Sequence, residues 1–165
     1  MSKKTLVVFH SASGNTKAVA AAIAEALSAD LEEIREVHPR PAKIGGQGLG
    51  NLINFLYSGF SASLGLPTQI HEAQHKAADY DLVVVGSPVY AGSLPAPART
   101  YLKQYQSQFK EAAFFVTGED PEKARALKQM GQVCGKVAKA AAAFKADKIR
   151  AGDFQARVQD FVARL

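Results

Sequence analysis

A short polar segment, Ser11–Thr16, has the residue types that bind phosphate through hydroxyls and backbone amides. It carries hydroxyls at Ser11, Ser13 and Thr16, and Gly14 allows a ligand to approach the backbone closely. Because the segment lies between an apolar run and an Ala-rich helical pattern, it also brings the positive end of a helix dipole to the ligand. We therefore interpret it as a phosphate cradle that needs no arginine. A simple turn with a helix cap is the alternative interpretation.

Two further loops follow later apolar runs and could surround a flat aromatic ligand beside that phosphate. They are Gly86–Gly92 and Thr117–Asp120. Tyr90 could stack on such a ligand, while the glycine-bearing loops could offer backbone amides in its plane. In open α/β sheets, ligands bind beyond the carboxyl ends of the strands, where we expect these loops to lie. For Tyr90, an aromatic side chain that caps the sheet edge is the alternative.

Five runs of residues predict the strands that position these loops. Most of the runs are nearly continuous stretches of apolar residues, which is typical of strands in a parallel sheet covered on both faces. One run, Leu31–Val37, places its apolar residues among charges and predicts an edge strand with one solvated side. The other four runs are Thr5–Phe9, Leu82–Val85, Ala112–Val116 and the weaker Ala140–Phe144.

Helical patterns lie between the strands. A proline near the start of one pattern favours a first helical turn, and Asp153 is a candidate N-cap for the last helix. The predicted helices are Thr16–Leu27, Pro95–Tyr105, one from about Pro121 to Val133, and Phe154–Leu165. Because strands that alternate with helices need crossover connections, the pattern predicts a doubly wound α/β fold with a parallel sheet.

The length of the chain, 165 residues, predicts a single domain over residues 1–165. Within it, residues of about 42–70 form an insert that is too long for a bare connection. The stretch Leu52–Phe60 of this insert is apolar enough for a short helix. Such a helix could belong to the core, cover the ligand as a flap, or form a dimer surface.

The three loops, taken in order, resemble the FMN site of the flavodoxin family. Ser11–Thr16 is similar to the family's phosphate fingerprint, and the segment DLVVVGSPVYAG, residues 81–92, looks like its third strand and first flavin-flanking loop. The resemblance covers nearly the whole chain and implies a flavodoxin-like five-stranded parallel sheet in the order 2-1-3-4-5, with helices on both faces. It also implies FMN as a noncovalently bound cofactor.

Under this resemblance, each loop is assigned one part of FMN. The first loop binds the phosphate, the second flanks the isoalloxazine with Tyr90 on or beside the ring, and the third approaches the pyrimidine side through backbone amides. The Glu119 carboxylate is expected to avoid the ring, because it would repel the reduced anionic flavin. The assigned residues are Ser11, Ala12, Ser13, Gly14, Asn15 and Thr16, then Pro88, Val89, Tyr90, Ala91 and Gly92, then Thr117, Gly118 and Glu119. No catalytic side chain and no metal ligand is assigned.

Two features depart from the family pattern. The chain has no Trp, so the Trp–flavin–Tyr sandwich of many flavodoxins cannot form. Where many flavodoxins have a Gly whose peptide flips toward the flavin, this chain has Ala91, followed by Gly92. Because Ala is penalised at positive φ by on the order of 1 kcal/mol, we expect weaker stabilisation of the one-electron reduced flavin here.

The composition excludes several other classes of protein. A single cysteine, Cys134, rules out an intramolecular disulfide and thiol-clustered zinc sites, and we expect it to be buried. No stretch approaches the roughly 18 apolar residues of a membrane span, so a cytoplasmic protein is expected. The net charge of +5 is spread rather than clustered with aromatic residues, so nucleic acid is not an expected partner.

The resemblance implies electron transfer through FMN to or from a redox partner protein, with the basic surface as a docking face. The first alternative is an NAD(P)H-dependent FMN quinone or flavin reductase, which Ala91, the basic surface and the apolar insert favour. The second alternative is a flavin-free binding module of the same fold. The sequence leaves open whether the protein forms a homodimer.

Overall fold

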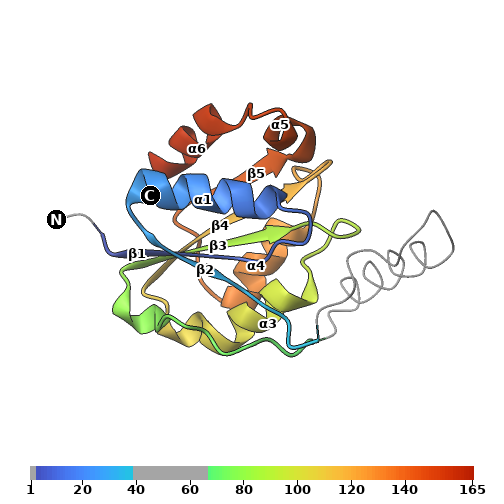
Figure 1. Ribbon diagram of the computed structural model, residues 1–165. Coiled ribbons are helices and arrows are strands. Elements are labelled where there is room, and N and C mark those ends of the chain that lie inside the picture. Colours follow the sequence, from blue (N-terminus) through green and yellow to red (C-terminus); the bar gives the residue numbers. More distant parts are fainter. Residues whose placement is uncertain (1–2, 39–66) are drawn as a thin grey trace, which may run out of the picture.

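The computed structural model describes residues 3–38 and 67–165. In this part of the chain, five strands form one parallel sheet in the order β2-β1-β3-β4-β5 (Figure 1). The strands are β1 (Thr5–Phe9), β2 (Asp30–Glu33), β3 (Leu82–Pro88), β4 (Glu111–Gly118) and β5 (Ala141–Lys145). The predicted sheet and its strand order are confirmed.

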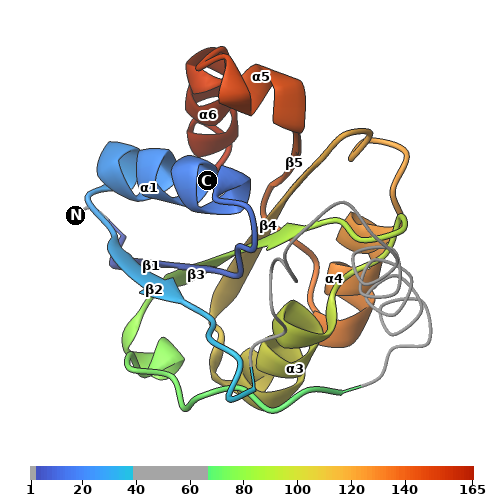
Figure 2. The same cartoon turned by 45° about the vertical axis from the view of Figure 1, so that its right-hand side comes forward.

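Helices cover both faces of this sheet (Figures 1 and 2). One face carries α1 (Asn15–Leu27), α5 (Ala146–Arg150) and α6 (Gln155–Val162). The other face carries α3 (Ala96–Tyr105) and α4 (Ala126–Cys134). Two short 3-10 helices, η1 (Ala77–Asp79) and η2 (Gln106–Gln108), precede β3 and β4.

Each face of the sheet has its own apolar core, which explains why the inner strands β1, β3 and β4 are largely apolar without alternation. Val8 packs with Leu102 and Met130 on the side of α3 and α4. Its neighbour in the chain, Val7, packs with Ile23 of α1 on the opposite side. Because successive side chains of a strand point to opposite faces, both positions must be apolar when both faces are covered.

The edge strand β2 is shorter than predicted. It ends at Glu33 instead of Val37, and Leu31 is exposed while Ile34 is buried. Beyond Ile34 the chain pairs with a different segment: the N–H of Val37 donates to the carbonyl of Gln69 at 3.0 Å. The prediction of one solvated side therefore holds, but the last residues of the run belong to a separate antiparallel bridge.

Two helix starts differ from the prediction. Helix α4 begins at Ala126 rather than near Pro121, because the preceding residues form turns in which Lys123 pairs with Asp120 at 2.8 Å. The N-cap of α6 is Phe154 and not Asp153. The Asp153 carboxylate instead accepts a hydrogen bond from Nζ of Lys148 at 2.7 Å. Helix α5 was not predicted, since its five residues are too few to show a helical period.

Most of the predicted insert at 42–70, with its Leu52–Phe60 stretch, lies outside the described residues. No helix within residues 3–38 and 67–165 combines the length and the apolar character that crossing a bilayer requires.

Candidate functional site

The three loops that the sequence singled out follow β1, β3 and β4, which are neighbours in the sheet. Because these strands are parallel, their carboxyl ends and the loops that follow lie at one end of the sheet (Figure 1). The register brings the strand ends together directly, since Phe9 is opposite Gly86 and Pro88 is opposite Thr117. The fold thus gathers the predicted loops at one place.

The first loop forms the start of α1. Gly14 is the N-cap and has a φ of 94°, in the left-handed region that favours glycine. Oγ of Ser11 accepts hydrogen bonds from the N–H groups of Gly14 at 3.2 Å and Lys17 at 3.3 Å. Helix geometry offers no intrahelical acceptor to the N–H groups of Asn15 and Thr16. These two donors, together with the proton of the Ser11 hydroxyl, are therefore available to an anion.

Space for that anion exists above the loop. Ala12, Ser13 and Gly14 are exposed, and a Cβ placed on Gly14 would meet no atom of the described residues within 4 Å. The donors here are backbone amides and hydroxyls at the positive end of a helix, which is a combination suited to phosphate. The residues present therefore fit the phosphate group of a nucleotide.

One predicted phosphate residue behaves differently from the others. Oγ1 of Thr16 lies 2.8 Å from Oγ1 of Thr117, which is 101 residues away in the sequence. Both residues are buried, with exposed fractions of 1% and 2%. The Thr16 hydroxyl is thus turned into the protein, toward the third loop, and only its backbone N–H is left for a ligand. Sequence patterns could not reveal this contact, because no local signal relates the two positions.

The second loop contains a tight two-residue turn. Tyr90 and Ser93 exchange backbone hydrogen bonds of 3.0 and 2.9 Å around Ala91 and Gly92. Both central residues have positive φ, 47° for Ala91 and 74° for Gly92, as in a type I′ turn. Ala91 therefore already occupies the left-handed region that the sequence marked as costly for it.

Neighbouring elements hold this turn in place. From β4, the carbonyl of Thr117 accepts a hydrogen bond from the N–H of Val89 at 2.9 Å. From the start of α4, the N–H of Arg125 donates to the carbonyl of Gly92 at 2.8 Å. Oε1 of Gln129 accepts from the N–H of Leu94 at 2.7 Å. Sequence patterns do not point to Arg125, the N-cap of α4, or to Gln129 within α4, because neither lies in a segment with a ligand signal.

The third loop approaches the second closely. A Cβ on Gly118 would lie 3.4 Å from Cβ of Val89, at van der Waals contact. The Glu119 carboxylate is exposed and accepts a hydrogen bond from Arg150 at 3.0 Å. This ion pair directs the carboxylate toward α5.

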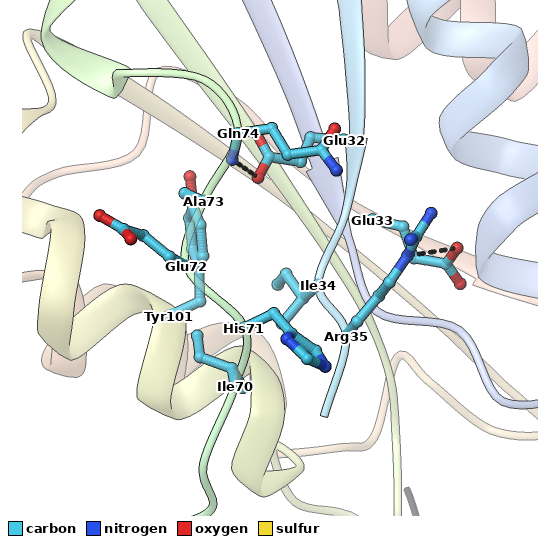
Figure 3. Close-up of a pocket in the computed structure, with 10 residues that line it drawn as sticks. All are labelled: Glu32, Glu33, Ile34, Arg35, Ile70, His71, Glu72, Ala73, Gln74 and Tyr101. Atoms are coloured by element: carbon cyan, nitrogen blue, oxygen red, sulfur yellow. Dashed lines mark hydrogen bonds and ion pairs between the residues drawn. The ribbon is translucent and has the colours of Figure 1, made fainter. Parts of the chain in front are cut away.

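A concave region lies beside β2, away from the three loops, and has a volume of about 370 Å³ (Figure 3). Its buried Glu32 carboxylate accepts hydrogen bonds from the N–H groups of Gln74 and His75 and faces Nδ1 of His75 at 2.9 Å. The hydroxyl of Tyr101, which reaches in from α3, has no hydrogen-bond partner among the described residues. Burial and the charge of Glu32 raise the pKa of Tyr101.

None of the residues that line this cavity belongs to the three loops. Its one buried carboxylate is already bonded to residues of its own chain. Among the described residues, no group of three His, Cys, Asp or Glu side chains could hold a metal ion. The loop cluster, and not the cavity beside β2, is therefore the candidate cofactor site.

Residues 4–146 match a protein family described as NADPH-dependent FMN reductase. None of the curated proteins compared with the chain matches it.

Several solved structures are similar in fold. A flavoprotein from Lactobacillus acidophilus NCFM in complex with FMN is 23% identical with a TM-score of 0.68, over 90% of this chain and 97% of that one. A candidate flavoprotein from Bacteroides uniformis ATCC 8492 is 19% identical with a TM-score of 0.73, over 99% of each chain. Oxidised flavodoxin 2 from Bacillus cereus is 16% identical with a TM-score of 0.54, over 98% and 99%. At these identities, the likenesses show a common fold.

Proposed function

The chain belongs to the NADPH-dependent FMN reductase family, and on this premise we propose that it is a reductase that takes electrons from NADPH through bound FMN. The flavodoxin-like fold and FMN as the cofactor, both expected from the sequence, are confirmed. When bound, FMN accepts a hydride from a reduced nicotinamide and passes the electrons on. The protein's own residues bind the cofactor and fix its position.

At the phosphate end, the proposed donors are the N–H groups of Asn15 and Thr16 and the hydroxyls of Ser11 and Ser13. Gly14 leaves room for the phosphate above the loop. Ala12, the remaining residue of the predicted set, is small and exposed beside it. Amide donors at a helix start suit a dianion because they carry partial positive charge without titrating.

At the ring end, we propose that residues 88–92 flank the isoalloxazine, with the half-buried Tyr90 on or beside its face. The backbone of residues 117–119 would approach the pyrimidine side. Thr117 itself is buried, so it can offer its backbone but not its side chain to a ligand. No side chain in the cluster is assigned as an acid or base.

The braced turn at Ala91 and Gly92 is the observation that carries the choice of a reductase over a one-electron carrier. A flip of the peptide between Ala91 and Gly92 during one-electron reduction would convert the type I′ turn into a type II′ turn, whose first central residue is typically glycine. The alanine at this position opposes the flip, because it reaches fewer backbone conformations than glycine. Such a turn favours two-electron chemistry.

A one-electron carrier is the second candidate. The fold shared with flavodoxin 2 from Bacillus cereus and the net charge of +5, which could attract an acidic redox protein, favour it.

In either case we propose a single domain over residues 1–165, placed in the cytoplasm. For the reductase, the electron acceptor would be a quinone or a free flavin.

Steady-state oxidation of NADPH by the purified, FMN-loaded protein with a quinone as acceptor distinguishes these candidates. A reductase turns over many times without any other protein. A carrier shows turnover only when a separate flavoprotein reductase is added. A preparation that does not bind FMN would overturn both candidates.

A charge placed in the phosphate loop tests the site directly. Asn15→Asp puts a carboxylate at the first residue of α1, and we expect FMN affinity to fall at least about tenfold through repulsion of the phosphate. Gln155→Glu is the matched control, because it makes the same amide-to-carboxylate change at the first residue of α6. An acid at a helix start is stabilising by itself, so neither variant should lose stability. Equal FMN affinity in both variants would contradict the proposed phosphate site.

A further inference from the structure

Thr117 contacts both of the other loops of the site. Its hydroxyl oxygen lies 2.8 Å from that of Thr16 in the first loop, and its carbonyl accepts from Val89 in the second loop at 2.9 Å. The residue is 2% exposed, so its side chain faces protein and not the ligand space. Its role at the site must therefore be exerted through the residues it touches.

The hydrogen bond between the Thr16 and Thr117 hydroxyls is buried, so breaking it is costly. A buried hydroxyl that loses its partner keeps the full cost of its desolvation. Thr16 is the second residue of α1, so a fixed Thr16 side chain also fixes the backbone N–H groups of Asn15 and Thr16. Those N–H groups are the donors that helix geometry leaves for a ligand.

We propose that Thr117 is a positioning residue for the phosphate end of FMN: its hydroxyl holds Thr16, and with it the first turn of α1, where the phosphate binds. The proposal rests on the proposed function, since it assumes that FMN occupies the loop cluster. The Thr117 side chain thus acts on the phosphate end indirectly, through Thr16, and does not touch the cofactor.

The test compares FMN with riboflavin, which has the same ring but lacks the phosphate. Thr117→Val keeps the shape of the side chain and removes the hydroxyl. We expect FMN affinity to fall about fivefold, the equivalent of one net hydrogen bond, while riboflavin affinity changes less than about twofold. Thr117→Ser, which keeps the hydroxyl, should bind FMN nearly as the wild type does. Fluorescence quenching of each flavin on titration with apoprotein measures both affinities.

The partner residue, Thr16, allows a second test of the same hydrogen bond. Thr16→Val removes the other hydroxyl of the same bond, so it should weaken FMN binding as much as Thr117→Val does. The double variant should lose no more than either single variant, because each already removes the bond. The double variant also leaves no unpaired hydroxyl, so it serves as the folded reference if a single variant is unstable.

Three results would overturn the proposal. Equal losses for FMN and riboflavin would show that Thr117 only supports the fold. Unchanged affinity for both flavins would show that the bond has no role in binding. Additive losses in the double variant would show that the Thr16 hydroxyl reaches the phosphate by itself. Failure of the wild-type protein to bind FMN would instead overturn the proposed function, so the two failures are distinguishable.

Discussion

Gly86 of β3 lies directly beside Phe115 of β4, and the phenyl ring covers the position where a side chain at Gly86 would be. A Cβ on Gly86 would overlap with Cζ of that ring, so one of the two would have to move. The ring is held from its other sides, since Phe144 and Phe161 meet it edge-on with centroid separations of 6.1 and 6.5 Å. The glycine is therefore required by packing between two strands that both lead into the candidate cofactor site.

We expect Gly86→Ala to destabilise the protein by about 3 kcal/mol, the upper part of the range for overpacked cores. In a Phe115→Leu background the same replacement should cost much less, because the clashing ring atoms are gone. Gly131→Ala in α4 is the control: its Cβ would meet open space, and a helical Gly→Ala change stabilises by about 0.5–1 kcal/mol. Urea unfolding followed by circular dichroism measures all of these changes. An equal cost of Gly86→Ala in both backgrounds would refute the packing explanation.

Burial on both faces explains which parts of the fold the sequence could predict. The run Thr5–Phe9 is buried at every residue and apolar after Thr5, and its predicted bounds agree with β1. Gly86 illustrates the limit, because the sequence suggests a loop there while the structure continues β3 to Pro88. Only the neighbouring Phe115, which fills the space of the missing side chain, shows why glycine belongs inside that strand.

Only part of the candidate site could likewise be predicted from the sequence. The loops could be found because each follows an apolar run and carries glycine or hydroxyl residues. The contacts between loops could not, since the bond from Thr16 to Thr117 and the bond from Arg125 to Gly92 join positions that are distant in the chain. Such contacts depend on the register of strands and on helix placement, which local patterns do not specify.

The strain at Ala91 gives a prediction for stability. Ala91→Gly should stabilise the protein by about 0.5 kcal/mol, because relief of the left-handed conformation exceeds the added entropy of glycine in the unfolded chain. Gly92→Ala should destabilise it by about 1 kcal/mol, since its φ of 74° is also left-handed. Thermal unfolding of the apoprotein measures both. Destabilisation by Ala91→Gly would show that the alanine side chain makes a favourable contact in this turn.

The same replacement should change the behaviour of the cofactor. In the FMN-loaded Ala91→Gly variant, we expect more one-electron reduced flavin during stepwise reduction, because glycine permits both orientations of the peptide. Visible absorption spectra recorded during the reduction measure its proportion. A wild-type protein that already accumulates this form in large amounts would contradict the expectation drawn from Ala91.

From the raised pKa of Tyr80 we expect the protein to lose stability at alkaline pH. Burial and the hydrogen bond from its hydroxyl to Asp30, 2.7 Å long, raise the pKa of Tyr80 from 10.0 to about 12. Because the folded protein holds this proton more tightly than the unfolded chain, the stabilisation is complete below pH 10 and is lost as the pH rises to about 12. Denaturant unfolding at a series of pH values should show a shallower decline in Tyr80→Phe. Parallel profiles of the two proteins would exclude this role.

We expect the buried Cys134 thiol to react slowly in the native protein. The residue is 1% exposed, and burial raises the pKa of its thiol. Because the thiolate is the reactive species, the native protein should react with an aromatic disulfide reagent only as fast as it opens, and at once in denaturant. Val137→Cys is the control, since Val137 is 97% exposed. Rapid reaction of the native wild-type protein would mean that the α4 end opens readily.

Tyr80 and Tyr101 predict opposite effects of losing a hydroxyl at neutral pH. The Tyr80 hydroxyl donates to Asp30, so Tyr80→Phe should destabilise the protein by about 1 kcal/mol. The Tyr101 hydroxyl is buried and has no partner among the described residues. Tyr101→Phe removes a hydroxyl whose desolvation cost no hydrogen bond offsets, so we expect a stabilisation of about 1 kcal/mol. The two variants share the same chemical change, and urea unfolding compares them directly. Destabilisation by Tyr101→Phe would show that water in the cavity beside β2 binds this hydroxyl, since a polar cavity of about 370 Å³ has room for it.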